Sequence, residues 1–504
     1  MRLRGYFVSV VLLLLALAAP ASAQPAQCPN PAPDPPPVTI SAQLPQNVCL
    51  PASPTAPGIP FFDDFSWRSF VALIWPSIPG RRGVPNTGVP PGGSGKPVFQ
   101  TYKADWEVFL PGGSAPTPWS SYDVKNNPCG GPLPYGYLML ASYSKFGNVQ
   151  LTGVGTMTGP LISQNVQYTR FQAAFNQVSF NDIVNGKWYL QSALSNNITF
   201  TPDQLNNNPI DIKSSWVIMT PDMNQDRFYT TLAQVYDTDT GKCAVQTVGL
   251  VGLHIVTKTP TRPQWIWSTF EQIDNIPQAG AQKPYTYNNG DGTPMPAKNP
   301  IPLPTPKPCV TVPAVDPCPF NIDRLQPIAD STMTTNGNYQ RALAKQGSGV
   351  WQYYQLVMTQ WPTPGTPPAP PGMNGGPANT IPGNTTSPMT SFANVTMEPF
   401  LQAKISGGCM ACHNSAAADS GAGTDFNWAV PMNAYSPGHA QLGTASLLHV
   451  HALTKTKAKP PSAAVQKLID ILAQAQKDME ASPKTAKTPA KNNAKPKAKT
   501  KTDK

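Results

Sequence analysis

The sequence predicts an α+β protein, with a β-rich antiparallel body, long Pro/Gly loops, a small helical segment and a disordered basic tail. Three observations predict it. Short runs of aromatic, β-branched and long apolar residues recur between positions 135 and 274, with turns between them. Proline accounts for 61 of the 504 residues and only 12% are charged, which favours irregular loops. Hydrophobic residues still make up 40% of the chain, enough for a folded core.

Residues 1–23 have the layout of a secretory signal peptide. Two arginines precede the apolar run of residues 7–19, and Ala21-Ser22-Ala23 supplies small residues for cleavage. We expect cleavage near Ala23/Gln24 and a periplasmic or secreted protein of the bacterial envelope. An uncleaved N-terminal anchor is the alternative. No other stretch reaches the roughly 18 apolar residues that a membrane span needs.

The mature chain is expected to start with a Pro-rich leader at 24–60, followed by the body at 61–386. A helix is predicted from Phe61 to Trp75, with Asp63 or Asp64 as its cap. Strands are predicted at 137–140, 216–219, 228–232, 245–256 and 265–270, and helices near 166–178 and 339–345.

The last predicted strand has two different faces. Alternation places Trp265, Trp267 and Thr269 on one face. Ile266, Ser268 and Phe270 fall on the other.

The basic charge of the chain is concentrated at its C-terminus. Residues 453–504 hold 13 lysines against four acidic residues, so they supply +9 of the formal net charge of +10. A helix is predicted at 462–480, with disorder after it. The nearly neutral body gives no support for nucleic-acid binding. The tail is expected either to contact an anionic surface or to remain a solvated segment without a specific role.

The chemistry-bearing motif is Cys409-Met410-Ala411-Cys412-His413, at the end of a helical pattern that starts at Thr396. C-x-x-C-H is the pattern of covalent haem c attachment. Its two thiols lie one helical turn apart, so they suit the two vinyl groups of one haem, and the next residue offers an imidazole to the iron. A thioredoxin-like pair lacks its βαβ context here, a zinc site lacks a second ligand pair, and a disulfide across two residues is strained.

Residues 396–437 resemble the attachment region of single-haem c-type cytochromes. The resemblance implies that Cys409 and Cys412 carry haem c and that His413 is its proximal iron ligand. It covers about a tenth of the chain. Small cytochromes c usually continue further before a methionine ligand and a closing helix.

The body is similar to uncharacterised secreted bacterial proteins with the same C-terminal motif. This resemblance rests on Leu253-His254-Ile255-Val256 and Trp265-Ile266-Trp267. It does not indicate which activity the body has.

Several residues are candidates for the distal iron ligand. Met432 is the first, because it follows a proline in a loop that can fold back over the haem. His254 is the second, and its alternative role is that of a buried strand histidine. Three histidines also follow the motif, at positions 439, 449 and 451. An open distal site is the remaining alternative.

Six further cysteines predict three structural disulfides in this oxidising compartment. The most local pairings are Cys28–Cys49 and Cys309–Cys318. No nucleophile elbow, P-loop or dinucleotide-binding motif is present in the sequence, so no catalytic residue is assigned.

The sequence thus predicts a periplasmic mono-haem c-type cytochrome that transfers single electrons to or from a redox partner protein. One alternative is a haem enzyme or sensor with an open distal site. The other is a substrate-oxidising or ligand-binding body that feeds electrons to the haem.

Overall fold

A computed structural model of the chain describes the body and parts of the C-terminal region. The described residues are 33–50, 58–122, 127, 129, 133, 136–141, 161–203, 207–237, 242–291, 321–361, 393–399, 409, 413, 415–437, 463–464, 466–467 and 470. The predicted signal peptide, Cys28, Cys309, Cys318, Cys412, the three C-terminal histidines and the tail beyond 470 lie outside them. The described residues of the predicted 462–480 helix are helical.

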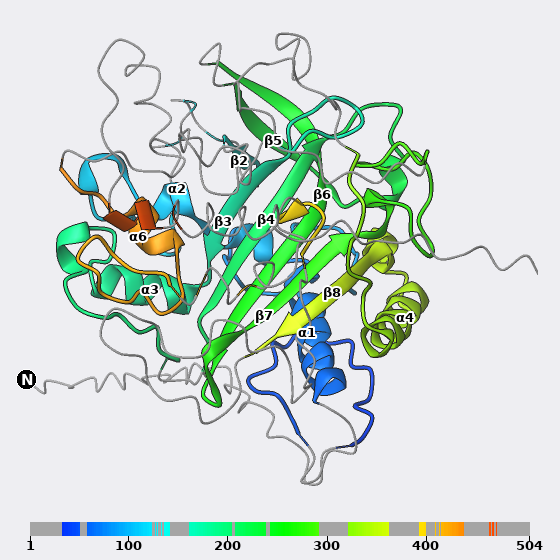
Figure 1. The fold of residues 1–504 in the computed structure, drawn as a ribbon, viewed down its shortest axis with the longest axis horizontal. Helices are drawn as coiled ribbons and strands as arrows, with labels where there is room; N and C mark the ends of the chain where they lie inside the picture. The colour runs from blue at the N-terminus through cyan, green and yellow to red at the C-terminus, as the bar shows by residue number, and fades with distance from the viewer. Residues whose placement is uncertain are drawn as a thin grey trace, which may run out of the picture.

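One sheet of eight strands organises the described body (Figure 1). All neighbouring strands are antiparallel except β2 and β5. The order runs β1-β3-β4-β6, and the long β6 then pairs with β5 along its first half and with β7 along its second. The sheet is strongly curled, and the mixed α+β class is confirmed. The strands are β1 Lys103–Ala104, β2 Leu138–Leu140, β3 Arg170–Phe175, β4 Ile210–Ile218, β5 Thr230–Asp237, β6 Lys242–Thr259, β7 Arg262–Gln272 and β8 Tyr354–Gln360.

Helices α1 (Ile59–Ile74) and α4 (Asp330–Lys345) cover one face of the sheet (Figure 1). Their apolar side chains pack on Leu253 and Ile255 of β6 and on Phe270 of β7. Trp67 of α1 stacks on Tyr339 of α4, with ring centroids 5.2 Å apart. This is the main hydrophobic core of the described body.

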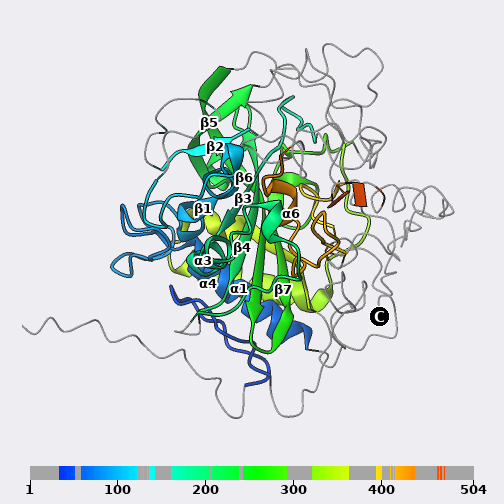
Figure 2. The same cartoon turned by 90° about the vertical axis from the view of Figure 1, so that its left-hand side faces the viewer.

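The opposite face receives α3 (Gln177–Asn185), the short α2 (Asp105–Val108) and the C-terminal residues 415–437, which include α6 (Ala429–Asn433). Figure 2 shows the orange C-terminal segment beside β7. Trp265 and Trp267 point to this side, whereas Ile266 and Phe270 pack on the other. The predicted alternation of β7 is therefore confirmed.

Two local predictions are wrong. Residues near 166–178 do not form one helix, because Arg170–Phe175 pairs along its length with β4. The helix α3 begins only after Asn176, whose side-chain oxygen accepts the N–H of Ser179. Likewise, neither Asp63 nor Asp64 caps a helix, since α1 starts at Ile59 and both carboxyl groups are turned into the protein.

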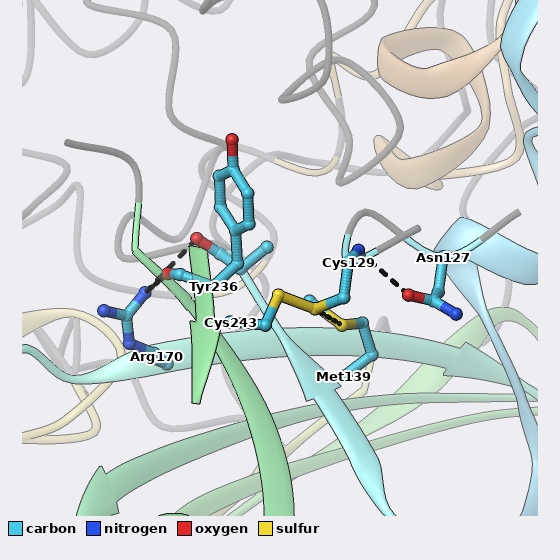
Figure 3. Close-up of a disulfide and its surroundings, with 7 residues drawn as sticks. Asn127, Cys129, Met139, Arg170, Tyr236 and Cys243 are labelled. Carbon is cyan, nitrogen blue, oxygen red and sulfur yellow. Dashed lines mark hydrogen bonds between the residues drawn. A yellow bond between two sulfur atoms is a disulfide. The ribbon is translucent and has the colours of Figure 1, made fainter. Parts of the chain in front are cut away.

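A disulfide joins Cys129 to Cys243, at the start of β6 (Figure 3). This pair is not one of the two local pairings that the sequence suggests. The Met139 sulfur of β2 lies 3.3 Å from Cys129 Sγ. The disulfide therefore ties the segment that precedes the short edge strand β2 to the start of β6.

Asp63 is fully buried between α1, α4 and β8. It accepts hydrogen bonds from the hydroxyls of Thr332 (2.7 Å) and Thr359 (2.8 Å). Burial raises the pKa of Asp63 to about 7, and the two hydroxyl bonds only partly oppose this. The folded protein therefore holds a proton on Asp63 that the unfolded chain releases near pH 4.

We expect Asp63→Asn to reduce the pH dependence of stability. Between about pH 4 and 7 the folded wild type binds more protons than the unfolded chain. Its free energy of unfolding therefore falls as pH rises, by up to about 1.4 kcal/mol per pH unit for this group. The substituted amide carries no charge at any of these pH values, so the variant should gain stability over the wild type at pH 8 but not at pH 4.

Urea unfolding at several pH values measures this dependence. Asp64, whose pKa burial raises to about 6, acts in the same direction, so the slope should shrink without vanishing. The exposed Asp222→Asn is the matched control and should keep the wild-type slope. An unchanged slope in Asp63→Asn would contradict the assignment.

Candidate functional site

Cys409 and His413 both lie against the face of the sheet that carries Trp265 and Trp267. The half-buried Cys409 packs on an aromatic cluster, and His413 contacts Trp267 with ring centroids 4.3 Å apart. We define the aromatic cluster by its ring-bearing residues, Phe109, Phe175, Phe180, Tyr189, Phe200, Trp265, Trp267 and Phe426. The first and last residues of the predicted haem motif are thus both beside the body of the protein.

The orientation of the His413 imidazole is fixed by one hydrogen bond. Its Nδ1 lies 2.7 Å from the backbone carbonyl oxygen of Phe426. Because a carbonyl oxygen can only accept, Nδ1 carries the proton and donates it. The lone pair of the neutral ring is then on Nε2, which is the arrangement that a metal-binding histidine requires.

The carbonyl that receives this proton belongs to an unusual turn. Asp425 and Phe426 both have positive φ, at 52° and 66°, although neither is glycine. Such backbone costs about 1–3 kcal/mol per residue and persists only when its surroundings hold it. The Thr424 hydroxyl donates to the Asn427 carbonyl at 2.7 Å, and the Asn427 N–H donates to the Thr424 carbonyl at 2.9 Å. We call residues 424–427 the acceptor turn.

An ion pair joins the acceptor turn to β6. Lys258 Nζ lies 2.6 Å from Asp425 Oδ2, and each side chain is only 8% exposed. The backbone N–H of Phe200 donates to the same carboxylate at 2.8 Å. Asn427 adds a second link, because its side-chain amide donates to the carboxyl group of Asp211 in β4.

Asp182 and Asp211 both lie within electrostatic reach of Asp425, and Lys258 is near Asp182 and Asp425. Burial raises the pKa of Asp182 and of Asp425, and it raises that of Asp211 to about 7. For Asp425, the neighbouring Lys258 is the largest opposing influence. Full burial, together with the neighbouring charges of Asp425 and Asp182, favours the neutral form of Asp211.

The two candidate distal ligands occupy different places. Met432 is buried in α6, where Ala429 and Val430 pack on the aromatic cluster, as does Ala434 just after the helix. His254 lies on β6, and its Nε2 is 3.5 Å from Glu398 Oε2. A distal ligand would lie across the haem from His413, and these positions do not decide between the two residues, so both roles remain predictions.

The sequence patterns did not identify most of the residues that hold the site in place. Trp267 was assigned to a face, but its contact with His413 was not foreseen. Lys258, Asp425 and Asn427 gave no signal, because a single lysine in a strand and an Asp-Phe-Asn tripeptide are common in any protein. Thr396 was expected to open a helix, and residues 395–397 instead form a turn whose backbone is held by Asn394.

Comparisons with protein-family models, with curated proteins and with solved structures find no match to this chain. Within the described residues, no group of three or more His, Cys, Asp and Glu side chains is placed to hold a metal ion. No helix in the same part of the chain is long and apolar enough to cross a membrane.

We expect Asn427→Ala to lower the free energy of unfolding by about 1–3 kcal/mol, because buried polar groups lose their partners. Asp211 loses an amide donor, and the N–H of Val430 loses its acceptor, which lies 2.9 Å away. Urea unfolding measures the change. The exposed Asn207→Ala should alter stability by less than about 0.5 kcal/mol, and equal effects of the two substitutions would contradict the role of Asn427.

Proposed function

We propose that this chain is a periplasmic mono-haem c-type cytochrome that carries single electrons to or from a redox partner protein. Cys409 and Cys412 would attach the haem through thioethers, and His413 would bind its iron. When bound, haem c supplies reversible one-electron exchange between Fe(III) and Fe(II).

One observation carries the proposal, namely the hydrogen bond from His413 Nδ1 to the Phe426 carbonyl at 2.7 Å. It fixes the tautomer that presents Nε2 to a metal, and it does so for the histidine of a C-x-x-C-H motif. A thiol pair that worked by disulfide exchange would have no need of this arrangement. The Cys129–Cys243 disulfide fits an oxidising compartment, where such attachment takes place.

The chain's own residues would have distinct tasks at this site. Trp267 packs against the imidazole ring and limits its rotation. The aromatic cluster keeps water from the side of His413 that faces the sheet, since its members are at most 8% exposed. Such a dry surrounding raises the influence of nearby charges and hydrogen bonds on a redox centre.

We expect Cys409→Ala/Cys412→Ala to abolish covalent haem attachment, because both thioethers are lost. The measurement is a pyridine haemochrome assay on protein made with a cytochrome-maturation system, expressed as haem per chain. The matched control is Cys129→Ala/Cys243→Ala, which removes two other cysteines and should keep one haem per folded chain. Haem-free wild type, or equal loss in both variants, would refute the proposal.

Met432 remains our proposed distal ligand and His254 the alternative. We expect Met432→Ala to let the reduced protein bind carbon monoxide rapidly, because the sixth iron position opens. His254→Ala should leave carbon monoxide binding slow, since His254 Nε2 already lies beside Glu398. Stopped-flow absorbance distinguishes the two. Rapid binding in His254→Ala alone would reverse the assignment, and rapid binding in the wild type would favour an enzyme or sensor with an open site.

A further inference from the structure

Two neighbouring strands of the body act on the surroundings of the His413 imidazole, one by direct contact and one through the acceptor turn. Trp267 of β7 meets the ring directly. Its partner in the sheet is Val256 of β6, and Lys258 follows on the same face of β6. Lys258 then reaches Asp425 in the acceptor turn, next to the carbonyl that receives the His413 proton.

The acceptor turn does not hold its shape through its own hydrogen bonds alone. Two successive residues with positive φ aim the Phe426 carbonyl, and although aspartate tolerates this backbone, the bulky Phe426 does not favour it. From outside the turn, Lys258 Nζ and the Phe200 N–H reach the Asp425 carboxyl group at 2.6 Å and 2.8 Å, and the Trp265 side chain lies beside it. Lys258 supplies the charged contact, which is the stronger kind.

Burial makes this pair sensitive to loss of either partner. Both side chains are 8% exposed, so removal of one charge leaves the other in a poorly solvated place. The turn is then expected to rearrange until the remaining group reaches water or is neutralised. The Phe426 carbonyl would move with the acceptor turn, away from His413 Nδ1.

We propose that Lys258 and Asp425 are positioning residues for the proximal histidine, with their ion pair holding the Phe426 carbonyl on His413 Nδ1. This inference rests on the proposed function for its redox consequence, but not for its geometry. Donation from Nδ1 makes an imidazole a more electron-rich ligand, which favours Fe(III) and lowers the potential. The body of the protein, and not the C-terminal segment alone, thereby sets the redox potential.

The test uses the double substitution Lys258→Met/Asp425→Asn. It removes one positive and one negative charge together and so keeps the net charge of the protein. A shift in redox potential therefore cannot come from a change in net charge. The matched control is Arg227→Met/Asp274→Asn, which removes another buried ion pair, with Arg227 Nε 2.6 Å from Asp274 Oδ2, beyond the far end of β7. Lys258→Arg keeps the charge and the donors, and serves as the rescue.

The first readout is the tautomer of His413 in the full chain made without haem, from ¹⁵N NMR of the imidazole. The wild type should show the Nδ1–H tautomer. The double variant should lose it in favour of the Nε2–H form, which neutral imidazole prefers in water. Lys258→Arg and the control that removes the Arg227–Asp274 pair should retain the wild-type tautomer.

The second readout is the midpoint potential of the haem-loaded protein, which should rise in the double variant and stay unchanged in the control and the rescue.

If the wild type takes up no haem, the proposed function fails, and the tautomer still tests the inference. If the double variant does not fold, Asp425→Asn, whose amide oxygen can still accept from Phe200, provides the tautomer comparison. Retention of the Nδ1–H form without the ion pair, or its loss in the control, would overturn the proposal.

Discussion

Strand β6 presents two chemically different faces, and the rest of the described structure is arranged around that difference. Leu253 and Ile255 point into the core formed with α1 and α4. Val256 and Lys258 point the other way, to the aromatic cluster and the acceptor turn. A shift of one residue in the register of β6 would exchange these two sets and destroy both contacts. Its pairing with β4, β5 and β7 fixes that register along most of its 18 residues.

The C-terminal segment depends on this face of the sheet for its shape. Few of its described residues form regular structure, and α6 has only five. Its fold comes instead from single contacts with the body, such as Asp425 with Lys258, Asn427 with Asp211, and the Ser420 hydroxyl with the Leu194 carbonyl. Because these contacts join the described residues of the segment to the sheet, the site and the body should unfold together.

The sequence was informative where periodicity decides structure. The strands that contain Trp216, Thr230 and Trp265 were predicted because runs of aromatic and β-branched residues, with alternation around Trp265, are typical of strands. The helix near 166–178 failed because pairing with β4 outweighed local preference, and Asp63 failed as a cap because a short acidic pair resembles a helix start wherever it occurs. Neither error could be corrected without knowing which strands pair.

For the site, the sequence predicts only the proposed covalent chemistry. C-x-x-C-H identifies the thiols and the histidine because their spacing is local in sequence. Phe426 acts through its backbone carbonyl, which no side-chain pattern reveals. Lys258 and Asp425 are 167 residues apart, and their pairing follows from how the segment docks on the sheet. Sequence thus indicates the proposed cofactor, whereas the environment that would tune it is a property of the fold.

The central claim is that one haem is bonded to this chain at the C-x-x-C-H motif. Mass spectrometry of the denatured mature protein, made with a maturation system and digested into peptides, tests it most directly. Our account predicts that the peptide containing Cys409 and Cys412 is heavier by the mass of one haem, and that no other peptide is. A motif peptide of unmodified mass, or one carrying only a disulfide, would contradict it.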